Sequence, residues 1–354
     1  SGGDVELFSE LFLRQQHGAS SAYRDWFYDL RFDAQSPFGD PFTYQPWANH
    51  YDLVKLNLRH PDVRSHLFEA VRMWIQGFDL DGLRLDAADC LDFDFMQALR
   101  SFCRQLRPDF WLMGEVVHGD YRRWANPTTL DSVTNYEGYK SLYSSLVDKN
   151  YFEVAYALNR QFGTGGIYQD LPLYNFADNH DVDRVAASLG NPAHLYPLYL
   201  LLFSMPGVPS IYYGSEWGLS ARRAPHSDAE LRPNLDLREM QRAAPQRNLA
   251  GDISRLAAIR RSFPALRRGG YRPLHVGHEQ LAFARFTNQE TVVVVLNAAD
   301  KPVALDIPLP HASRSAVDVL NQNERFSIHG GSLRLERVEP HWGRILKLEE
   351  GGDQ

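Results

Sequence analysis

Apolar and polar positions follow two alternating patterns between residues 61 and 263. Segments with apolar residues at helical spacing are followed by short, continuous apolar runs of strand length, such as FWLMGEVV at residues 110–117. The predicted helices cover residues 61–76, 92–106, 139–160, 182–189, 194–203 and 253–263, and the predicted strands end near Asp86, Val117, Asn135, Ala177 and Tyr213. Strands that are buried on both faces and alternate with helices form a parallel sheet covered by helices, so an α/β fold is predicted.

The pattern changes at residues 269–270, where short strands separated by turns begin. They are expected at residues 275–278, 281–286, 291–296, 303–307, 333–335 and 344–348. This spacing is typical of a small antiparallel β domain. We therefore expect an α/β part at residues 1–268 and a β-sandwich at residues 269–354. Within the first part, residues 4–16 predict an amphipathic helix, and the aromatic-rich residues 20–50 predict a long ordered loop.

Composition narrows the class of protein. The 354 residues are 44% hydrophobic and 23% charged, as in ordinary soluble globular proteins. The formal net charge of −7 argues against binding to nucleic acid or to an anionic membrane, because both attract basic surfaces. No apolar run reaches the roughly 18 residues of a membrane span. Cys90 and Cys103 are too few for a disulfide framework and favour two buried free thiols in a reducing, cytoplasmic compartment, with secretion left open.

Residues 77–90, GFDLDGLRLDAADC, predict a buried strand that ends at Arg84 and Asp86. In a barrel of parallel strands, side chains at the carboxyl ends of the strands point into the active site. The permanent cation of Arg84 favours the ionised form of Asp86, and an ionised, oriented carboxylate can attack a sugar carbon as a nucleophile. A structural ion pair or a helix cap explains this stretch, taken alone, about equally well.

Two further carboxylates stand at the ends of predicted strands. Glu115 comes late in the run FWLMGEVV, and Asp181 follows the run LPLYNFA in the string ADNHD. If the strands are parallel neighbours, Asp86, Glu115 and Asp181 project into one mouth. Their mutual repulsion favours a proton on at least one of them. A protonated acid beside an ionised carboxylate is the minimum needed to cleave a glycosidic bond through a covalent intermediate.

Three strings together resemble the α-amylase superfamily of glycoside hydrolases. They are GLRLDAADC at residues 82–90, WLMGEVVHG at residues 111–119 and FADNHD at residues 176–181. The resemblance implies a (β/α)8 barrel of α-amylase type, with only its later strands in this chain, followed by the β-sandwich.

The same resemblance implies a role for each matching residue. Asp86 corresponds to the nucleophile, and Arg84 to the arginine that steadies it. Glu115 corresponds to the general acid and base. Asp181 corresponds to the carboxylate that binds sugar hydroxyls and stabilises the transition state, with His180 beside it.

Two details favour the neopullulanase and cyclomaltodextrinase branch. Residues 53–57, LVKLN, resemble a Pro-Lys-Leu-Asn string of those enzymes, with Val54 in place of Pro. After Asp86, where secreted α-amylases often carry Lys-His, this chain has Asp89-Cys90. The resemblance implies retaining hydrolysis, or transfer, of α-glucosidic bonds, with α-1,4 or α-1,6 linkages. The expected substrates are maltooligosaccharides, cyclomaltodextrins or starch-like glucans, and no cofactor is required. Asp89 is a candidate for substrate binding, and a solvated residue between strand and helix is an equal alternative.

Other candidates for substrate binding carry less specific signals. His118 could line subsites on the leaving-group side, while Trp47 and Tyr136 could stack on sugars. A loop histidine without a special role and aromatics that pack a loop are comparable alternatives. No His/Cys cluster has metal-ligand spacing, so no metal residue is predicted. A structural Ca²⁺ occurs in many family members, but no acidic loop of the required density is visible here.

The resemblance also indicates what the sequence lacks. The family's earlier motif, an Asp and a His that hold the bound sugar, is not found upstream of Asp86. The N-terminal part of the barrel is therefore expected to be missing, with residues 20–50 as a remnant of a barrel-loop domain. About five barrel strands leave two open edges, which predicts a homo-oligomer or a domain-swapped assembly. The alternative function is that of a non-catalytic, truncated α-amylase-like binding or scaffold protein.

Overall fold

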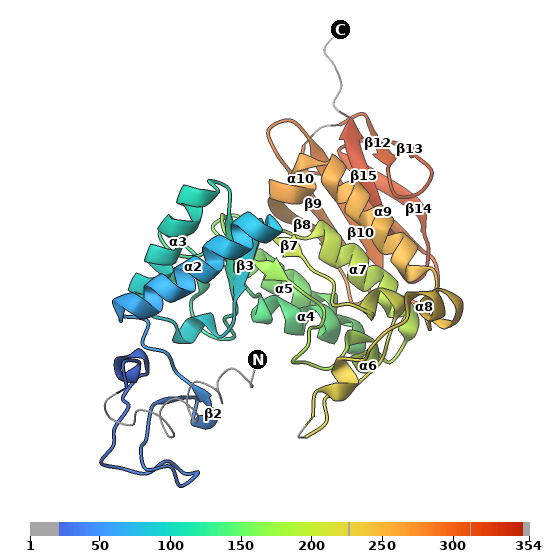
Figure 1. Cartoon of the computed structure of the whole chain (residues 1–354). Helices are drawn as coiled ribbons and strands as arrows, with labels where there is room; N and C mark the ends of the chain where they lie inside the picture. The colour runs from blue at the N-terminus through green and yellow to red at the C-terminus, as the bar shows by residue number, and fades with distance from the viewer. Residues whose placement is uncertain (1–20, 226, 312, 350–354) are drawn as a thin grey trace. The chain divides into compact units, whose positions relative to one another are not determined.

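The computed structural model describes residues 21–225, 227–311 and 313–349. The helix expected at residues 4–16 lies outside these ranges. Two compact units make up the described chain. The first unit ends at Glu115 and includes residues 126–130, and the second holds residues 116–125 and the chain from Asp131 onward. Figure 1 labels the helices and strands of both units.

The first unit contains two short parallel strands with helices before each of them. Its elements are η3 (Arg24–Trp26), β1 (Pro46–Trp47), β2 (His50–Val54), α2 (Pro61–Phe78), β3 (Gly82–Leu85), η4 (Ala88–Cys90), α3 (Phe93–Leu106) and β4 (Trp111–Gly114). Strands β3 and β4 pair in parallel, with Gly82 opposite Trp111 and Leu85 opposite Gly114. A Cβ on Gly82 would lie 2.4 Å from the carbonyl oxygen of Trp111, so only glycine permits this close approach. The carboxyl ends of the two strands therefore lie side by side.

Both helices of the first unit begin where the sequence predicts. Pro61 occupies the first turn of α2, where its missing N–H costs nothing. The Asp92 carboxylate caps α3 by accepting a hydrogen bond from the backbone N–H of Phe95 at 3.0 Å. Arg59 and Arg64 also form ion pairs with Asp92, at 2.8 and 3.4 Å. These starts fix the direction in which the chain enters and leaves β3.

The region expected to be one long loop at residues 20–50 contains a hairpin. Strands β1 and β2 pair in antiparallel fashion across Ala48 and Asn49, whose positive φ angles of 45° and 68° suit a tight turn. Three aromatic residues, Phe27, Phe42 and Tyr44, form a small buried core beneath it. These aromatics come from a bridge residue, a bend and an irregular stretch rather than from one regular element, so the sequence shows no helical or strand period here.

The second unit starts with the remaining parallel strands and most of the helices. Its first elements are η5 (Tyr121–Arg123), β5 (Ser132–Val133), α4 (Tyr136–Val147), α5 (Tyr151–Phe162), β6 (Tyr174–Asn175), α6 (Val185–Ser188), η6 (Pro192–His194), α7 (Leu195–Ser204), β7 (Val208–Pro209), η7 (Ser215–Trp217), η8 (Ala229–Leu231), α8 (Leu237–Ala243), α9 (Leu249–Ser262) and α10 (Pro264–Arg268). Strands β6 and β7 pair in parallel, and Thr134 bridges to Tyr174 in parallel. The parallel ladder predicted from the sequence is thus present.

The strands of this ladder are shorter than predicted. A strand was expected over residues 171–177, but β6 covers two residues only. Side chains replace part of the ladder here, because the buried Asn175 amide accepts a hydrogen bond from Asn135 at 2.8 Å and donates one to the Pro206 carbonyl at 2.7 Å. The helix expected at residues 182–189 is likewise reduced to the four residues of α6.

The C-terminal part is an antiparallel β-sandwich, as predicted. Its strands are β8 (Gly270–Val276), β9 (Gln280–Phe286), β10 (Thr291–Asn297), β11 (Val303–Pro308), β12 (Ser315–Asp318), β13 (Glu324–Ser327), β14 (Ser332–Val338) and β15 (Trp342–Glu349). Six of them form one sheet in the order β13-β12-β15-β10-β9-β8, and β11 pairs with β14 in a second sheet. Residues of both sheets, including Val293, Ile307 and Leu335, share one buried core. The sequence did not predict β12 and β13.

Helix α7 packs against the other face of the large sheet, beside β10 and β15, and α9 packs on α7 (Figure 1). Because both faces are covered, every residue of β10, TVVVVLN, is buried. The expectation of two buried thiols is wrong for Cys90, which is exposed, and right for Cys103. No helix among the described residues is both long and apolar enough to cross a membrane.

Candidate active site

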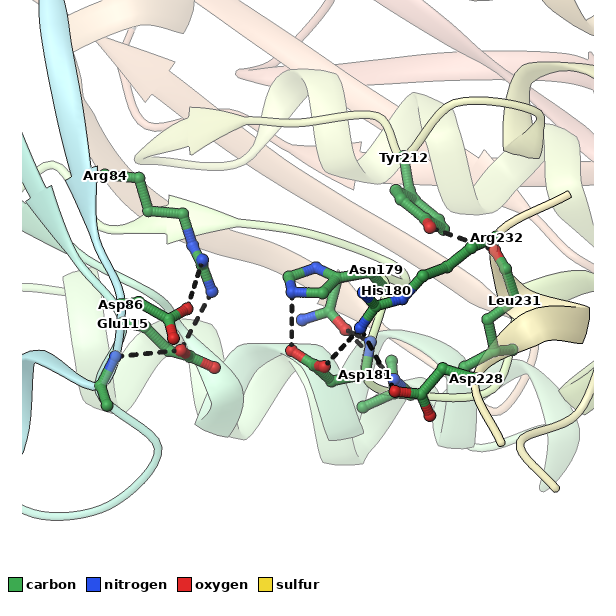
Figure 2. Close-up of polar contacts among 12 residues, drawn as sticks. Arg84, Asp86, Glu115, Asn179, His180, Asp181, Tyr212, Asp228, Leu231 and Arg232 are labelled. Carbon is green, nitrogen blue, oxygen red and sulfur yellow. Dashed lines mark hydrogen bonds and ion pairs between the residues drawn. The ribbon is translucent and has the colours of Figure 1, made fainter. Parts of the chain in front are cut away.

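Arg84 links the two carboxylates that follow β3 and β4. Its Nη1 lies 2.7 Å from Oδ1 of Asp86, and its Nη2 lies 3.0 Å from Oε2 of Glu115 (Figure 2). The Asp86 side chain is 78% exposed, whereas that of Glu115 is only 15% exposed. One guanidinium with its donors in a fixed fork therefore orients both carboxylates and offsets their mutual repulsion.

The backbone after β3 also holds Glu115. The ladder continues past the strands, because Glu115 donates its N–H to the Leu85 carbonyl at 2.9 Å and accepts the Ala88 N–H at its own carbonyl, also at 2.9 Å. Ala87 has a left-handed backbone with φ 42°, and its N–H donates to the Glu115 carboxylate at 3.3 Å. A non-glycine residue in this conformation is strained, and such strain is common at functional sites. Glu115 is thus fixed by main chain and side chain together.

Asp89 and Trp47, two of the residues predicted to bind substrate, meet at Cys90. Both side chains hydrogen-bond with its thiol. Partial burial raises the pKa of the Cys90 thiol, and the charge of the Asp89 carboxylate adds to this rise. Trp47 is 39% exposed and stacks on His50 with ring centroids 5.6 Å apart. Trp47, on the hairpin of β1 and β2, therefore lies beside Cys90, which follows Asp86 closely along the chain.

In the second unit, Asn179 organises the string ADNHD. Its Oδ1 accepts the backbone N–H groups of Asp181 and Val182, at 2.8 and 3.1 Å. Its Nδ2 donates to the phenolic oxygen of Tyr136 at 3.1 Å, and Nε2 of His180 lies 3.1 Å from Oδ2 of Asp181 (Figure 2). Tyr136, His180 and Asp181 are thus brought together as one group, although Tyr136 was only a weak candidate in the sequence.

Beneath this group lies a buried polar cluster. Asp178 accepts hydrogen bonds from the Val185 N–H at 2.9 Å and from the Ser215 hydroxyl at 2.7 Å. Burial raises the pKa of the Asp178 carboxyl to about 6. The fully buried Arg184 donates to the Tyr213 carbonyl, the Ser215 hydroxyl and the Leu231 carbonyl at 2.7–3.1 Å. These residues cap and anchor the loops around Asp181.

Sequence reasoning missed the residues that surround Asp181 from residues 222–232. Nη2 of Arg232 lies 3.5 Å from Oδ1 of Asp181, and Nη1 of Arg223 donates to the Asp181 backbone carbonyl at 3.4 Å. Asp228 pairs with both arginines. No local pattern marks this segment, because it contains only a short 3₁₀ helix and its contacts lie about fifty positions away along the chain. A surplus of arginine in SARRAPHSDAELRP was the one available signal.

One residue predicted to bind substrate has no further support from the geometry. His118 is exposed on the segment before η5. Among the described residues, no group of three or more His, Cys, Asp or Glu side chains could hold a metal ion. The meeting of Asp86, Glu115 and Asp181 at one mouth stays a prediction, as does the separation of Asp86 and Glu115 by roughly 5–5.5 Å that a retaining mechanism requires. What the geometry offers is a pair of carboxylates oriented by one arginine in the first unit and a third oriented carboxylate in the second.

Comparison with protein families gives a match over most of the chain. Residues 7–259 match the family model described as "Alpha amylase, catalytic domain". The chain belongs to the alpha-amylase family. Residues 271–342 match a second model, "Maltogenic Amylase, C-terminal domain". The strings around Asp86, Glu115 and Asp181 thus lie inside the part of the chain that matches the catalytic domain of the family.

Relatives with known names belong to the branch that the sequence suggested. The cyclomaltodextrinase of Geobacillus thermopakistaniensis is 28% identical over 343 residues, which are 95% of this chain and 56% of that protein. Neopullulanase 2 of Thermoactinomyces vulgaris is also 28% identical, over 94% of this chain and 56% of that protein. The chain therefore spans about half the length of these family members.

Solved structures confirm the fold. A cyclomaltodextrinase structure superposes with a TM-score of 0.79 at 25% identity, covering 96% of this chain and 57% of that one. The α-amylase of Geobacillus thermoleovorans, complexed with acarbose, superposes with a TM-score of 0.77 at 22% identity, covering 98% of this chain and 75% of that one. The predicted α-amylase-type fold with its C-terminal β-sandwich is confirmed.

Proposed function

We propose that this chain carries the catalytic residues of a retaining glycoside hydrolase that cleaves α-glucosidic bonds. The observation that supports this most is the guanidinium of Arg84 between Asp86 and Glu115, at the ends of two paired parallel strands. An exposed carboxylate and a second, less exposed carboxyl group at the ends of neighbouring strands are the pair that a double displacement at a sugar carbon needs.

The proposed reaction has two steps. In the first, Glu115 gives its proton to the glycosidic oxygen while a carboxylate oxygen of Asp86 attacks the anomeric carbon, so that the leaving sugar departs and a glycosyl ester forms. In the second, Glu115 takes a proton from water, which attacks the same carbon and releases Asp86. Asp181, oriented by Asn179 and His180, accepts hydrogen bonds from the hydroxyls of the distorted sugar. No cofactor takes part.

Glu115 is the less exposed of the two carboxylates, with a side chain that is 15% exposed, and it contacts Arg84 and the Ala87 N–H. Asp86, with its side chain 78% exposed, has room for the sugar carbon that it attacks. The difference in exposure supports Glu115 as the acid and Asp86 as the nucleophile.

The names of the relatives suggest the class of substrate. They include a cyclomaltodextrinase, a maltogenic α-amylase and a neopullulanase. We extend this to maltooligosaccharides and cyclomaltodextrins for the present chain, with Trp47 and Asp89 at the rim of the site. The domain boundary at residue 268 is part of the same proposal, with residues 1–268 as the catalytic portion and residues 269–354 as the C-terminal domain.

A substrate panel tests this function. Purified protein, alone and beside a longer chain of the same protein, is offered maltotriose, maltoheptaose and β-cyclodextrin, and released reducing ends are counted. We expect turnover that Asp86→Asn abolishes, because an amide cannot form the glycosyl ester. Asp94→Asn, an exposed substitution in the first turn of α3, is the matched control and should keep full activity. Absence of turnover from both chain lengths would favour the non-catalytic binding or scaffold protein instead.

A further inference from the structure

Arg232 belongs to a network that joins two arginines, Arg223 and itself, to two aspartates, Asp181 and Asp228. Its Nη2 lies 3.5 Å from Oδ1 of Asp181 and 3.3 Å from Oδ2 of Asp228, so one nitrogen serves both carboxylates (Figure 2). Asp228 in turn pairs with Nε of Arg223 at 3.1 Å, and Arg223 donates to the Asp181 backbone carbonyl at 3.4 Å. The network therefore closes on itself through both the side chain and the backbone of Asp181.

The segment that carries Arg232 is anchored one residue earlier. The carbonyl of Leu231 accepts hydrogen bonds from Nη2 of Arg184 at 2.7 Å and from the hydroxyl of Tyr212 at 3.1 Å. Arg184 is fully buried and its guanidinium lies 4.5 Å from the centre of the Tyr212 ring. Leu231 itself is fully buried. The position of Arg232 is thus set by a buried anchor, while its own side chain, 47% exposed, reaches back toward Asp181.

These contacts engage both carboxylate oxygens and the backbone N–H of Asp181. Oδ2 faces His180, Oδ1 faces Arg232, and the backbone N–H is held by Asn179. We propose that Arg232 is a positioning residue, which holds the Asp181 carboxylate in the orientation that accepts hydrogen bonds from a glucosyl unit. This inference rests on the proposed function, because it assumes that Asp181 contacts the sugar. Without Arg232, one oxygen of a side chain that is 34% exposed is released to rotate.

If Arg232 served only to stabilise the fold, its loss would lower the melting temperature, and we expect this effect to be small. Ion pairs between partly exposed side chains contribute little to folding stability. A substitution at Arg232 should therefore leave the melting temperature within about 2 °C of the starting value. Its effect should appear in catalysis, because a misplaced binding group can lower the rate about tenfold to a hundredfold without touching the reacting atoms.

The test compares three substitutions in the whole protein. Arg232→Met keeps an unbranched, apolar side-chain stem and removes the guanidinium charge. It should lower kcat/KM on maltoheptaose about tenfold to a hundredfold, mainly through kcat, because Asp181 acts on the distorted sugar. Arg232→Lys should recover most of the loss, since a single ammonium can replace the one nitrogen that contacts both aspartates. Arg222→Met is the matched control. It removes a more exposed arginine of the same loop, which pairs with Asp183 at 3.0 Å, and should leave kcat unchanged.

A double-mutant cycle separates an action through Asp181 from an independent one. In the Asp181→Asn background, Arg232→Met should cost less than threefold, because the group that Arg232 positions is already lost. The same two substitutions in an Asp86→Asn background should weaken maltoheptaose binding by calorimetry in the same non-additive way, independently of turnover. Full kcat in Arg232→Met, or a cost that is the same with and without Asp181, would overturn the inference while the proposed function stands. An inactive wild-type protein that binds no glucan would overturn both.

Discussion

At the scale of the residue, Asp178 is a buried carboxyl group whose charged form the fold disfavours. It lies almost fully buried beneath Asp181, and burial raises the pKa of its carboxyl from 3.8 to about 6, although Val185 and Ser215 donate hydrogen bonds to it. A raised pKa means that the folded protein prefers the protonated form. Asp178 therefore contributes stability that is fully present below its unfolded pKa of 3.8 and is lost as the pH rises through 6.

Asp178→Asn replaces the titrating carboxyl with a permanent neutral group of the same shape, which keeps an oxygen to accept both hydrogen bonds. We expect the free energy of unfolding of the variant, relative to wild type, to increase by about 2 kcal/mol between pH 4 and pH 7. Urea denaturation at both pH values measures this difference. Two proteins whose stabilities change in parallel with pH would show that Asp178 keeps its charge in the fold.

Local strings were enough to find some residues of the site but not others. Asp86 and Glu115 were predicted because each follows its own strand within a few positions, and the structure places them on one arginine that the sequence also marked. Arg232 was missed because its partners are distant in the sequence and its segment has neither period nor motif. A polar contact between loops is fixed by the anchoring of both loops, which no short window of sequence contains.

At the scale of the element, two buried arginines hold the end of α7. Arg285 on β9 donates to the carbonyls of Ser204, Leu266, Gly269 and Gly270 at 2.6–3.1 Å. Arg260 on α9 donates to the carbonyls of Phe203 and Met205 at 2.8 and 3.1 Å, and also to Gly207. Burial lowers the pKa of Arg260 to about 10 and that of Arg285 to about 9. Positive charge at the end of a helix, where carbonyls lack partners, ties α7 and β7 to the C-terminal sheet.

Arg285→Ala should be strongly destabilising, since it leaves two buried and two partly buried carbonyls without their donor. We expect a loss on the order of 4 kcal/mol in the free energy of unfolding. Arg272→Ala, an exposed position on the neighbouring strand β8 that pairs with Ala284, is the matched control and should cost less than about 1 kcal/mol. Equal effects of the two substitutions in chemical denaturation would show that the Arg285 contacts contribute nothing specific.

Elements themselves were predicted better than their lengths. The starts of α2 and α3 follow from Pro61 and Asp92, because a first-turn proline and an N-cap aspartate act locally. The strand at residues 171–177 shrank to β6 because the buried amide of Asn175 bonds across the ladder, and this is not visible in an apolar run. Strands β12 and β13 were missed since they are only four residues long and carry charge, which hides their period.

At the scale of the whole molecule, the assembly of the chain stays a prediction. Five parallel strands, β3 to β7, are found in the described part of the chain, and an eight-stranded barrel would need three more. Unpaired edges that expose several hundred Å² of apolar surface would cost on the order of 10 kcal/mol, as much as a typical domain has in total stability. We therefore expect the chain, produced by itself, to associate with a second copy or with another polypeptide that covers the edges.

Size-exclusion chromatography with light scattering, together with the intact mass of the same sample, measures the assembly. A particle of at least twice the 40.5 kDa chain mass, or an additional polypeptide in the sample, is the expected result. A monodisperse particle of one chain, free of other fragments, would contradict the argument from open edges. In that case the cost of an unpaired edge is smaller than the area estimate implies.

The central claim is that Asp86 forms a covalent bond to the sugar and that Glu115 supplies and removes the proton. The most direct measurement is peptide mass spectrometry of Glu115→Gln after incubation with α-maltosyl fluoride. Fluoride leaves without an acid, whereas the second step needs the base that this variant lacks, so the ester should accumulate. We predict one maltosyl group on the peptide that contains Asp86, and none in Glu115→Gln combined with Asp86→Asn. Fluoride release from Glu115→Gln with an unmodified Asp86 would contradict the account.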